Sequence, residues 1–217
     1  MTDNESSYAR AGDHGAGDHG AGELGAGDHG AGELGADADR TVVFSLGSNL
    51  GDRLANLQLG LDVLASSDLV LVAVSSVYET DPVGGVEQAD YLNAVLLARS
   101  SLPPADMLAR CAAAEAEAGR VRTQRWGPRT LDVDIIVCGC VVSSDPALTL
   151  PHPRAHERAF VLIPWLELDS RAALPGRGLV AELLKTTPAV PDSPHGVRRR
   201  PELLLTLPAQ EADAPCS

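Results

Sequence analysis

Strand-like and helix-like patterns alternate along the chain from residue 41 onward. Alternating or β-branched apolar residues predict four strands, at residues 41–46, 69–78, 91–99 and 131–137. Helical spacing or helix-end signals predict four helices: one carrying Leu54, Leu57, Leu61 and Leu64, one from Pro103-Pro104 to about Gly119, and two at 154–168 and 178–186. The order β-α-β, then β-α-β, predicts an α+β protein in which helices pack on a mainly antiparallel sheet.

The two ends of the chain have different patterns. Residues 11–35 are five pentads of the form AGDHG or AGELG, which offer few side chains to bury, so we expect residues 1–40 to form a disordered tail. Three histidines in these pentads could tether a metal weakly, but a solvated tail is the favoured interpretation. The folded domain is expected at 41–186, and a proline-rich extension, for which the pattern predicts no element, at 187–217.

The charge and the apolar content of the chain limit its possible partners. The net charge is −13, and the first forty residues, with nine acidic and two basic residues, carry more than half of it. A mildly acidic body argues against binding to nucleic acid or to anionic membranes. No apolar run approaches the roughly 18 residues of a membrane span, and the four cysteines form no disulfide-rich pattern. We therefore expect a soluble cytoplasmic protein.

The segment RWGPRTLDVDII at residues 125–136 carries the clearest chemical signal. In a strand, Asp132 and Asp134 face one side, whereas Leu131, Val133, Ile135 and Val137 face the other. Two carboxylates about 7 Å apart can bind hard divalent ions such as Mg²⁺. The alternative, favoured when the two acids are considered alone, is a strand with one solvated face.

Arginines surround this pair of acids. Six occur between residues 120 and 158: Arg120, Arg122, Arg125, Arg129, Arg154 and Arg158. The guanidinium fork suits phosphate oxygens, so arginines beside a magnesium site indicate polyphosphate chemistry. No P-loop motif is present to bind phosphates in another way. An ordinary solvated loop remains the alternative, because the chain has a single lysine and uses arginine instead.

A few aromatic and amide residues suggest a slot for a flat polar ring. Tyr91 and Asn93 share a strand face, and Phe160 follows the arginine-rich region. Aromatic faces stack on heterocycles, and an amide offers both a donor and an acceptor. Considered without other clues, Tyr91 and Phe160 are better interpreted as core residues.

Together these segments resemble one enzyme family. Gly47-Ser48-Asn49-Leu50-Gly51, Tyr91-Leu92-Asn93, residues 125–136, and Pro151-His152 with Arg158 and Phe160 are similar to 6-hydroxymethyl-7,8-dihydropterin pyrophosphokinases of folate biosynthesis. The resemblance covers about residues 41–186. It implies a ferredoxin-like α+β sandwich that transfers diphosphate from ATP, its co-substrate, to the pterin hydroxymethyl group and releases AMP. It further implies two Mg²⁺ ions, small-molecule substrates and a monomer.

The resemblance also implies roles for individual residues. Asp132 and Asp134 would hold the metal ions and, with Arg120 and Arg129, form the catalytic set. ATP would contact Glu115, Arg122, Trp126, Ile135, His152 and Arg158. The pterin would contact Thr80, Val83, Tyr91, Asn93 and Phe160. The chain departs from the family at Asp81, where members often have a proline.

Two other functions fit part of the pattern. A non-catalytic module could bind pterin or nucleotide without transfer, although retention of Arg129, Asp132, Asp134 and His152 argues against this. A metal-dependent phosphodiesterase could use the same pair of acids on nucleic acid, but the acidic body argues against such a substrate.

Overall fold

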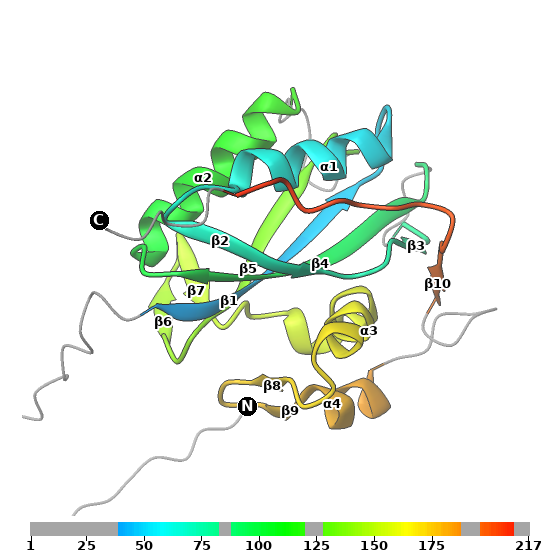
Figure 1. The fold of residues 1–217 in the computed structure, drawn as a ribbon. Helices are drawn as coiled ribbons and strands as arrows, with labels where there is room; N and C mark the ends of the chain where they lie inside the picture. Colours follow the sequence, from blue (N-terminus) through cyan, green and yellow to red (C-terminus); the bar gives the residue numbers. More distant parts are fainter. Residues whose placement is uncertain (1–38, 83–87, 120–127, 188–195, 211–217) are drawn as a thin grey trace, which may run out of the picture. The chain divides into compact units, whose positions relative to one another are not determined.

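The computed structural model describes residues 39–82, 88–119, 128–187 and 196–210. The predicted tail lies outside these residues, apart from Asp39 and Arg40, and Arg40 already begins the first strand. The elements, drawn in Figure 1, are β1 (Arg40–Ser48), α1 (Arg53–Leu64), β2 (Leu69–Val74), β3 (Tyr78–Thr80), β4 (Tyr91–Ser100), α2 (Pro104–Glu117), β5 (Asp132–Cys138), β6 (Ser143–Asp145), β7 (Leu148–Leu150), η1 (Ala155–Glu157), α3 (Ala159–Leu168), β8 (Ala173–Leu174), β9 (Gly178–Leu179), α4 (Val180–Thr186) and β10 (Val197–Arg199).

A six-stranded antiparallel sheet organises these elements. Its order is β10-β3-β4-β1-β5, and β2 also pairs with β4, beyond β3 along the same edge. Ser75, which follows β2 and precedes β3, also bonds to β4. Its backbone N–H donates to the Val95 carbonyl (2.9 Å), and its hydroxyl accepts from the Val95 N–H (3.0 Å). The strand predicted at 69–78 is thus interrupted, and Glu79 and Thr80, which lie outside the predicted strands, belong to β3.

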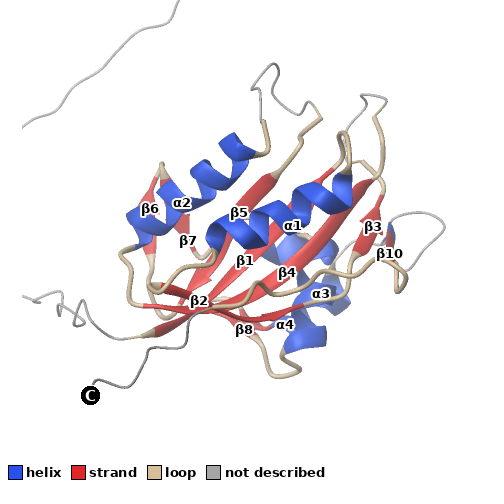
Figure 2. Ribbon diagram, turned by 45° about the horizontal axis from the view of Figure 1, so that its top comes forward, coloured by secondary structure: helices blue, strands red, loops and turns tan. Residues whose placement is uncertain are grey.

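Helices cover both faces of the sheet. Figure 1 and Figure 2 place α1 and α2 on one face and α3 and α4 on the other. On the first face, Leu57, Leu61 and Leu64 of α1 are fully buried against the sheet, and the Asp52 side chain caps the helix by accepting from the Ala55 N–H. The mixed architecture predicted from the sequence, with a mainly antiparallel sheet and packed helices, is confirmed.

A bulge in β5 changes which residues face each helical layer. Phe44 of β1 is opposite Ile135 and Val43 is opposite Val137, so Ile136 is the extra residue. Val133 and Ile135 pack in the core under α1 and α2, but Ile136 and Val137 pack with α3. The prediction that Val137 shares a face with Val133 and Ile135 is therefore wrong, because one inserted residue reverses the alternation.

The C-terminal extension packs on the domain. β10 pairs with β3, and Leu203, Leu205 and Leu207 contact the core under α1. Figure 1 shows this segment, coloured red, running back beside α1. The amide of Gln210 then bonds to the Leu71 N–H and the Leu69 carbonyl at the edge of β2. The boundary expected at residue 187 does not end the packed structure.

The remaining helices agree in part with the prediction. The segment predicted as one helix at 154–168 begins as the single 3-10 turn η1, and α3 starts at Ala159. Nowhere in the described ranges does a helix reach the length and apolar character needed to cross a membrane.

Candidate functional site

A cavity of about 430 Å³ opens on the α3 side of the sheet. Strands β1, β4 and β5 form its floor, and the segment from Arg154 to Phe160 forms a wall. It brings together eight of the predicted site residues: Thr80, Tyr91, Asn93, Arg129, Asp132, Asp134, Arg158 and Phe160.

Strand register places two polar residues in one row of this floor. Gly47 of β1 pairs with Asn93 on one side and with Asp132 on the other. A Cβ atom at Gly47 would lie 3.1 Å from the Asn93 Oδ1 atom, closer than most such contacts. Glycine at this position therefore keeps the floor open between the amide and the carboxylate.

The first region of the cavity, which we call the carboxylate end, contains Asp132 and Asp134. Both lie on the cavity face of β5, which confirms the prediction that they share a face. Asp132 pairs with Arg129, and the Asp134 Oδ2 atom lies 3.1 Å from Nη1 of Arg158. Burial acts to lower the pKa of Arg129, but the charge and hydrogen bond of Asp132 outweigh it and raise that pKa.

His152, another predicted site residue, does not line the cavity but lies next to Asp134 at this end. Its Nε2 atom is 3.7 Å from Oδ2 of Asp134, and its Nδ1 accepts from the Arg154 N–H at 3.2 Å. Burial lowers the pKa of His152, and the charge of Arg158 adds to this effect, while Asp134 opposes it. This shift favours the neutral ring, and the bond accepted at Nδ1 places its hydrogen on Nε2, which faces Asp134.

The second region, the amide end, contains Thr80, Tyr91, Asn93 and Phe160. The Asn93 amide is buried and donates from Nδ2 to the Thr80 hydroxyl at 2.8 Å. The Arg158 guanidinium lies 5.6 Å from the centre of the Phe160 ring, so Phe160 borders both ends. An amide next to aromatic rings fits the predicted slot for a flat heterocycle.

Asn49 connects Arg129 at the carboxylate end with the segment that leads into β4. Its backbone N–H donates to the Arg129 carbonyl (3.0 Å), and its Oδ1 accepts from the Arg129 N–H (2.7 Å). Its Nδ2 donates to Oε1 of Gln88 at 3.0 Å, and Gln88 lines the cavity. One buried side chain therefore positions the segment before β5 and the segment before β4.

The carboxylate end fits a hard metal ion. Among the residues that the structure describes, no cluster of three or more acids, histidines or cysteines could hold a metal. Two carboxylates on one strand face are nevertheless a common protein contribution for Mg²⁺, which keeps waters and substrate phosphates as its other ligands. In this structure the arginines balance the two carboxylate charges.

Some predicted site residues lie elsewhere. Glu115 is on α2, beneath the opposite face of the sheet, and accepts from the Val133 N–H at 3.1 Å. Ile135 is buried in the core on that same side. Neither lines the cavity, and their contacts with ATP stay predictions. Val83, Arg120, Arg122 and Trp126 lie outside the described residues.

Sequence reasoning missed several residues that line the cavity: Ser45, Gly47, Asp81, Pro82, Gln88, Arg154, Glu157, Ala159, Thr187, Gly196 and Val197. A signal existed for some of them, since Gly47 belongs to the turn motif and Arg154 to the arginine cluster. The others line the cavity because of tertiary contacts between distant segments, which local sequence patterns do not reveal.

Comparison with known proteins gives one consistent match. Residues 43–170 match the family model described as 7,8-dihydro-6-hydroxymethylpterin-pyrophosphokinase. The chain is similar to proteins named 2-amino-4-hydroxy-6-hydroxymethyldihydropteridine pyrophosphokinase. The one from Mycobacterium tuberculosis is 52% identical over 143 residues, covering 61% of this chain and 74% of that protein. The one from Bacillus subtilis is 44% identical over 125 residues, covering 57% and 75%.

A solved structure supports the fold. A crystal structure of a Plasmodium falciparum HPPK-DHPS triple mutant matches with a TM-score of 0.52 at 12% identity. The match covers 69% of this chain but 44% of that one, so the likeness extends over less than half of the Plasmodium chain.

Proposed function

Since the chain belongs to the 7,8-dihydro-6-hydroxymethylpterin-pyrophosphokinase family, we propose that the cavity is where it carries out the pyrophosphokinase step of folate biosynthesis. In that step the hydroxymethyl oxygen of the dihydropterin attacks the β-phosphorus of ATP. The bond from the β-phosphorus to the α-phosphate oxygen breaks, diphosphate is transferred, and AMP leaves. The two ends of the cavity suit the two substrates.

The carboxylate end would hold the triphosphate of ATP. Asp132 and Asp134 would bind two Mg²⁺ ions, which supply charge neutralisation across the phosphates when bound. Arg129 and Arg158, now paired with these carboxylates, would turn their guanidinium groups to phosphate oxygens, for which the planar fork is suited. The neutral His152 would donate its Nε2–H to a phosphate oxygen without adding charge.

The amide end would hold the pterin. The Asn93 side chain would pair with the polar edge of the ring, while Tyr91 and Phe160 would stack on its faces. The bond from Asn93 to Thr80 fixes the amide plane before the substrate arrives, which reduces the entropy lost on binding. The row of Asn93, Gly47 and Asp132 would bring the ring close to the phosphates.

Other expectations carried by the family resemblance stay predictions. Arg120, Arg122 and Trp126 would act from the arginine-rich loop, Val83 would contact the pterin, and Glu115 and Ile135 would contact the nucleoside. The connectivity β1-α1-β2-β4-α2-β5 with the strand order β5-β1-β4-β2 favours a ferredoxin-like sandwich. A monomeric, cytoplasmic enzyme remains the expectation from the sequence.

The observation that carries this proposal is the convergence of eight predicted site residues on one cavity. The test is an assay with ATP, hydroxymethyldihydropterin and Mg²⁺ that separates AMP from ADP. We expect AMP and the pterin diphosphate in equal amounts, and neither when the pterin is omitted or the metal is chelated. Release of ADP, or a stable ternary complex without turnover, would contradict the proposal.

A further inference from the structure

The C-terminal strand β10 forms part of the cavity wall at the amide end. Val197 pairs with Thr80 of β3, and both residues line the cavity, as does Gly196. The family match ends at residue 170, so this wall lies outside the segment that defines the family. The sequence of the extension alone predicts no such contact.

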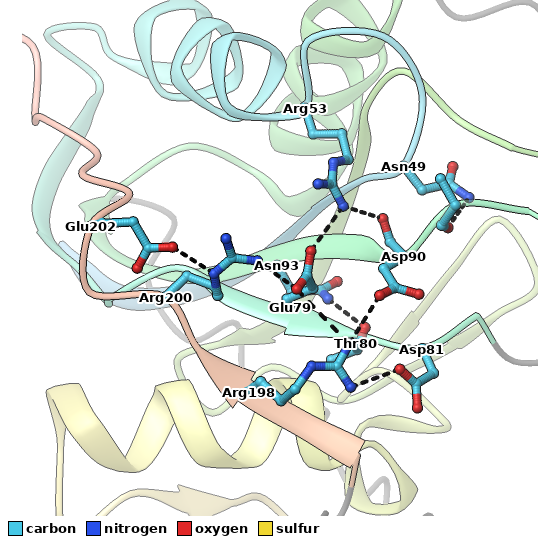
Figure 3. Close-up of polar contacts among 11 residues, drawn as sticks. Asn49, Arg53, Glu79, Thr80, Asp81, Asp90, Asn93, Arg198, Arg200 and Glu202 are labelled. Carbon is cyan, nitrogen blue, oxygen red and sulfur yellow. Dashed lines mark hydrogen bonds and ion pairs between the residues drawn. The ribbon is translucent and has the colours of Figure 1, made fainter.

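Arg198, the next residue on β10, joins two carboxylates that flank the amide end. Its Nη1 lies 2.8 Å from Oδ1 of Asp81, and its Nη2 lies 3.0 Å from Oδ2 of Asp90. Asp81 directly follows Thr80, and Asp90 directly precedes Tyr91. Figure 3 shows the guanidinium between the two carboxylates. Arg198 therefore bridges both ends of the connection between β3 and β4.

A second set of ion pairs supports this bridge. Glu79 of β3 is paired with Nη1 of Arg53 (3.2 Å) and with Nη1 of Arg200 (2.5 Å), and Arg53 also donates to the Asp90 carbonyl at 2.7 Å (Figure 3). These contacts attach β3 to α1 and to the residues after β10. Among the residues drawn in Figure 3, Arg198 is the one whose guanidinium contacts both Asp81 and Asp90.

The charges show why a bridge is needed here. Asp81 and Asp90 would repel each other if the guanidinium were removed, and Asp81 lines the cavity. Asp81 also stands where the resemblance leads us to expect a proline, which would restrict the backbone by itself. An ion pair to β10 can replace that restriction. The planar fork of arginine reaches two carboxylates at once, which a single ammonium group does less well.

We propose that Arg198 is a positioning residue for the pterin substrate: by holding Asp81 and Asp90, it secures the end of the β3–β4 ladder, where Thr80 and Tyr91 pair and face the amide end. The inference rests on the proposed function. Arg198 acts on the ring through these neighbours, because its side chain does not line the cavity.

The test compares Arg198→Ala with Arg199→Ala, measuring kcat and the KM of each substrate. Arg199 is the next residue of β10, but its side chain contacts Ser76 and Glu167. Because the Arg198 pairs are about 40% exposed, each is weak, and losing them should raise the KM for the pterin about 5- to 10-fold. The KM for ATP and kcat should change less than about twofold, and Arg199→Ala should match the wild type.

The single variant Asp90→Asn, which weakens the same bridge from its other side, keeps the test decisive if Arg198→Ala folds poorly. Asp90→Asn should raise the pterin KM by itself about 2- to 3-fold, and should add little in the Arg198→Ala background. An unchanged pterin KM in both single variants, or an equal rise in the KM for ATP, would overturn the inference. Absence of AMP release by the wild type would instead overturn the proposed function, so the two failures are distinguishable.

Discussion

The two ends of the cavity are assembled in different ways. The carboxylate end comes mainly from one continuous stretch, because Arg129, Asp132 and Asp134 lie within six residues of one another. The amide end combines β3, β4, the start of α3 and β10, which are far apart in the sequence. The first end is positioned by the alternation of a single strand, whereas the second depends on how four elements pack.

The difference also appears in how charge is balanced. At the carboxylate end, arginines pair with the acids that would bind metal ions. When substrate arrives, each arginine would leave its carboxylate for a phosphate oxygen, and the carboxylate would bind a metal ion instead. At the amide end, Arg198 pairs with two acids at the edge of the site, Asp81 and Asp90. Substitutions at the two ends should therefore have separable effects on the two substrates.

The largest effect is expected at the carboxylate end. If Asp134 binds a metal ion as proposed, Asp134→Asn should lower kcat at least about 1000-fold, because a charge that holds the ion at the reacting phosphates is removed. The melting temperature should change little, since the side chain is about one-third exposed. Asp62→Asn on the exposed surface of α1 is the control. Equal losses of melting temperature and activity would identify Asp134 as a structural residue.

The matching substitution at the amide end should weaken binding of the pterin and leave binding of the nucleotide unchanged. Asn93→Ala should raise the KM for the pterin about 100-fold, because a site built to hydrogen-bond a polar edge loses its partner. The affinity for an ATP analogue, measured by calorimetry, should stay within about threefold. A parallel loss of nucleotide affinity would show that the ends are not separate.

Asn49 provides a test of whether the two ends are independent, because it bonds to Arg129 at the carboxylate end and to Gln88, shortly before Tyr91 of the amide end. Asn49→Ala should lower kcat/KM about 10-fold for each substrate, since the bonds of its buried amide to Gln88, Ala89 and Arg129 are lost. Asn56→Ala is the matched control, because Asn56 lies on the first turn of α1 and its amide bonds to Leu50 and Ser48 instead. An effect on one substrate alone would contradict the linking role.

The smallest expected effect is on the pH dependence of stability, through the hydrogen bond that attaches α3 to β3. Burial and the hydrogen bond from the Tyr78 hydroxyl to Glu167 (2.9 Å) raise the pKa of Tyr78 to about 12. The fold therefore favours the neutral phenol. This contribution to stability is complete below about pH 10, the unfolded pKa, and is lost as pH rises toward 12.

Urea unfolding at pH 8 and pH 10.5 checks this expectation. The wild type should lose more stability between the two values than Tyr78→Phe does. Turnover at pH 8 should be nearly the same in both proteins. The same loss in both would show that Tyr78 titrates normally.

Much of the fold could be predicted because its elements are locally encoded. The strands 41–46, 91–99 and 131–137 and the leucine-rich helix were identifiable from periodicity. The bulge at Ile136 was not, since it depends on pairing with β1, and it reverses the face of Val137. The pairing of β10 with β3 likewise joins residues that no local pattern connects.

The same distinction applies to the site. Asp132, Asp134 and Arg129 follow from one motif, and alternation alone places the two acids together. Asp81, Gln88 and Val197 reach the cavity through tertiary contacts. The roles of Glu115 and Ile135 came from family resemblance, and both side chains lie on the opposite side of the sheet.

The most direct measurement is a crystal structure with a non-hydrolysable ATP analogue, Mg²⁺ and hydroxymethyldihydropterin. We predict metal ions bound to Asp132 and Asp134 beside the phosphates, and the pterin ring between Tyr91 and Phe160 with its polar edge at Asn93. Phosphates bound without any ion at the two carboxylates, or a pterin located outside the amide end, would contradict the account.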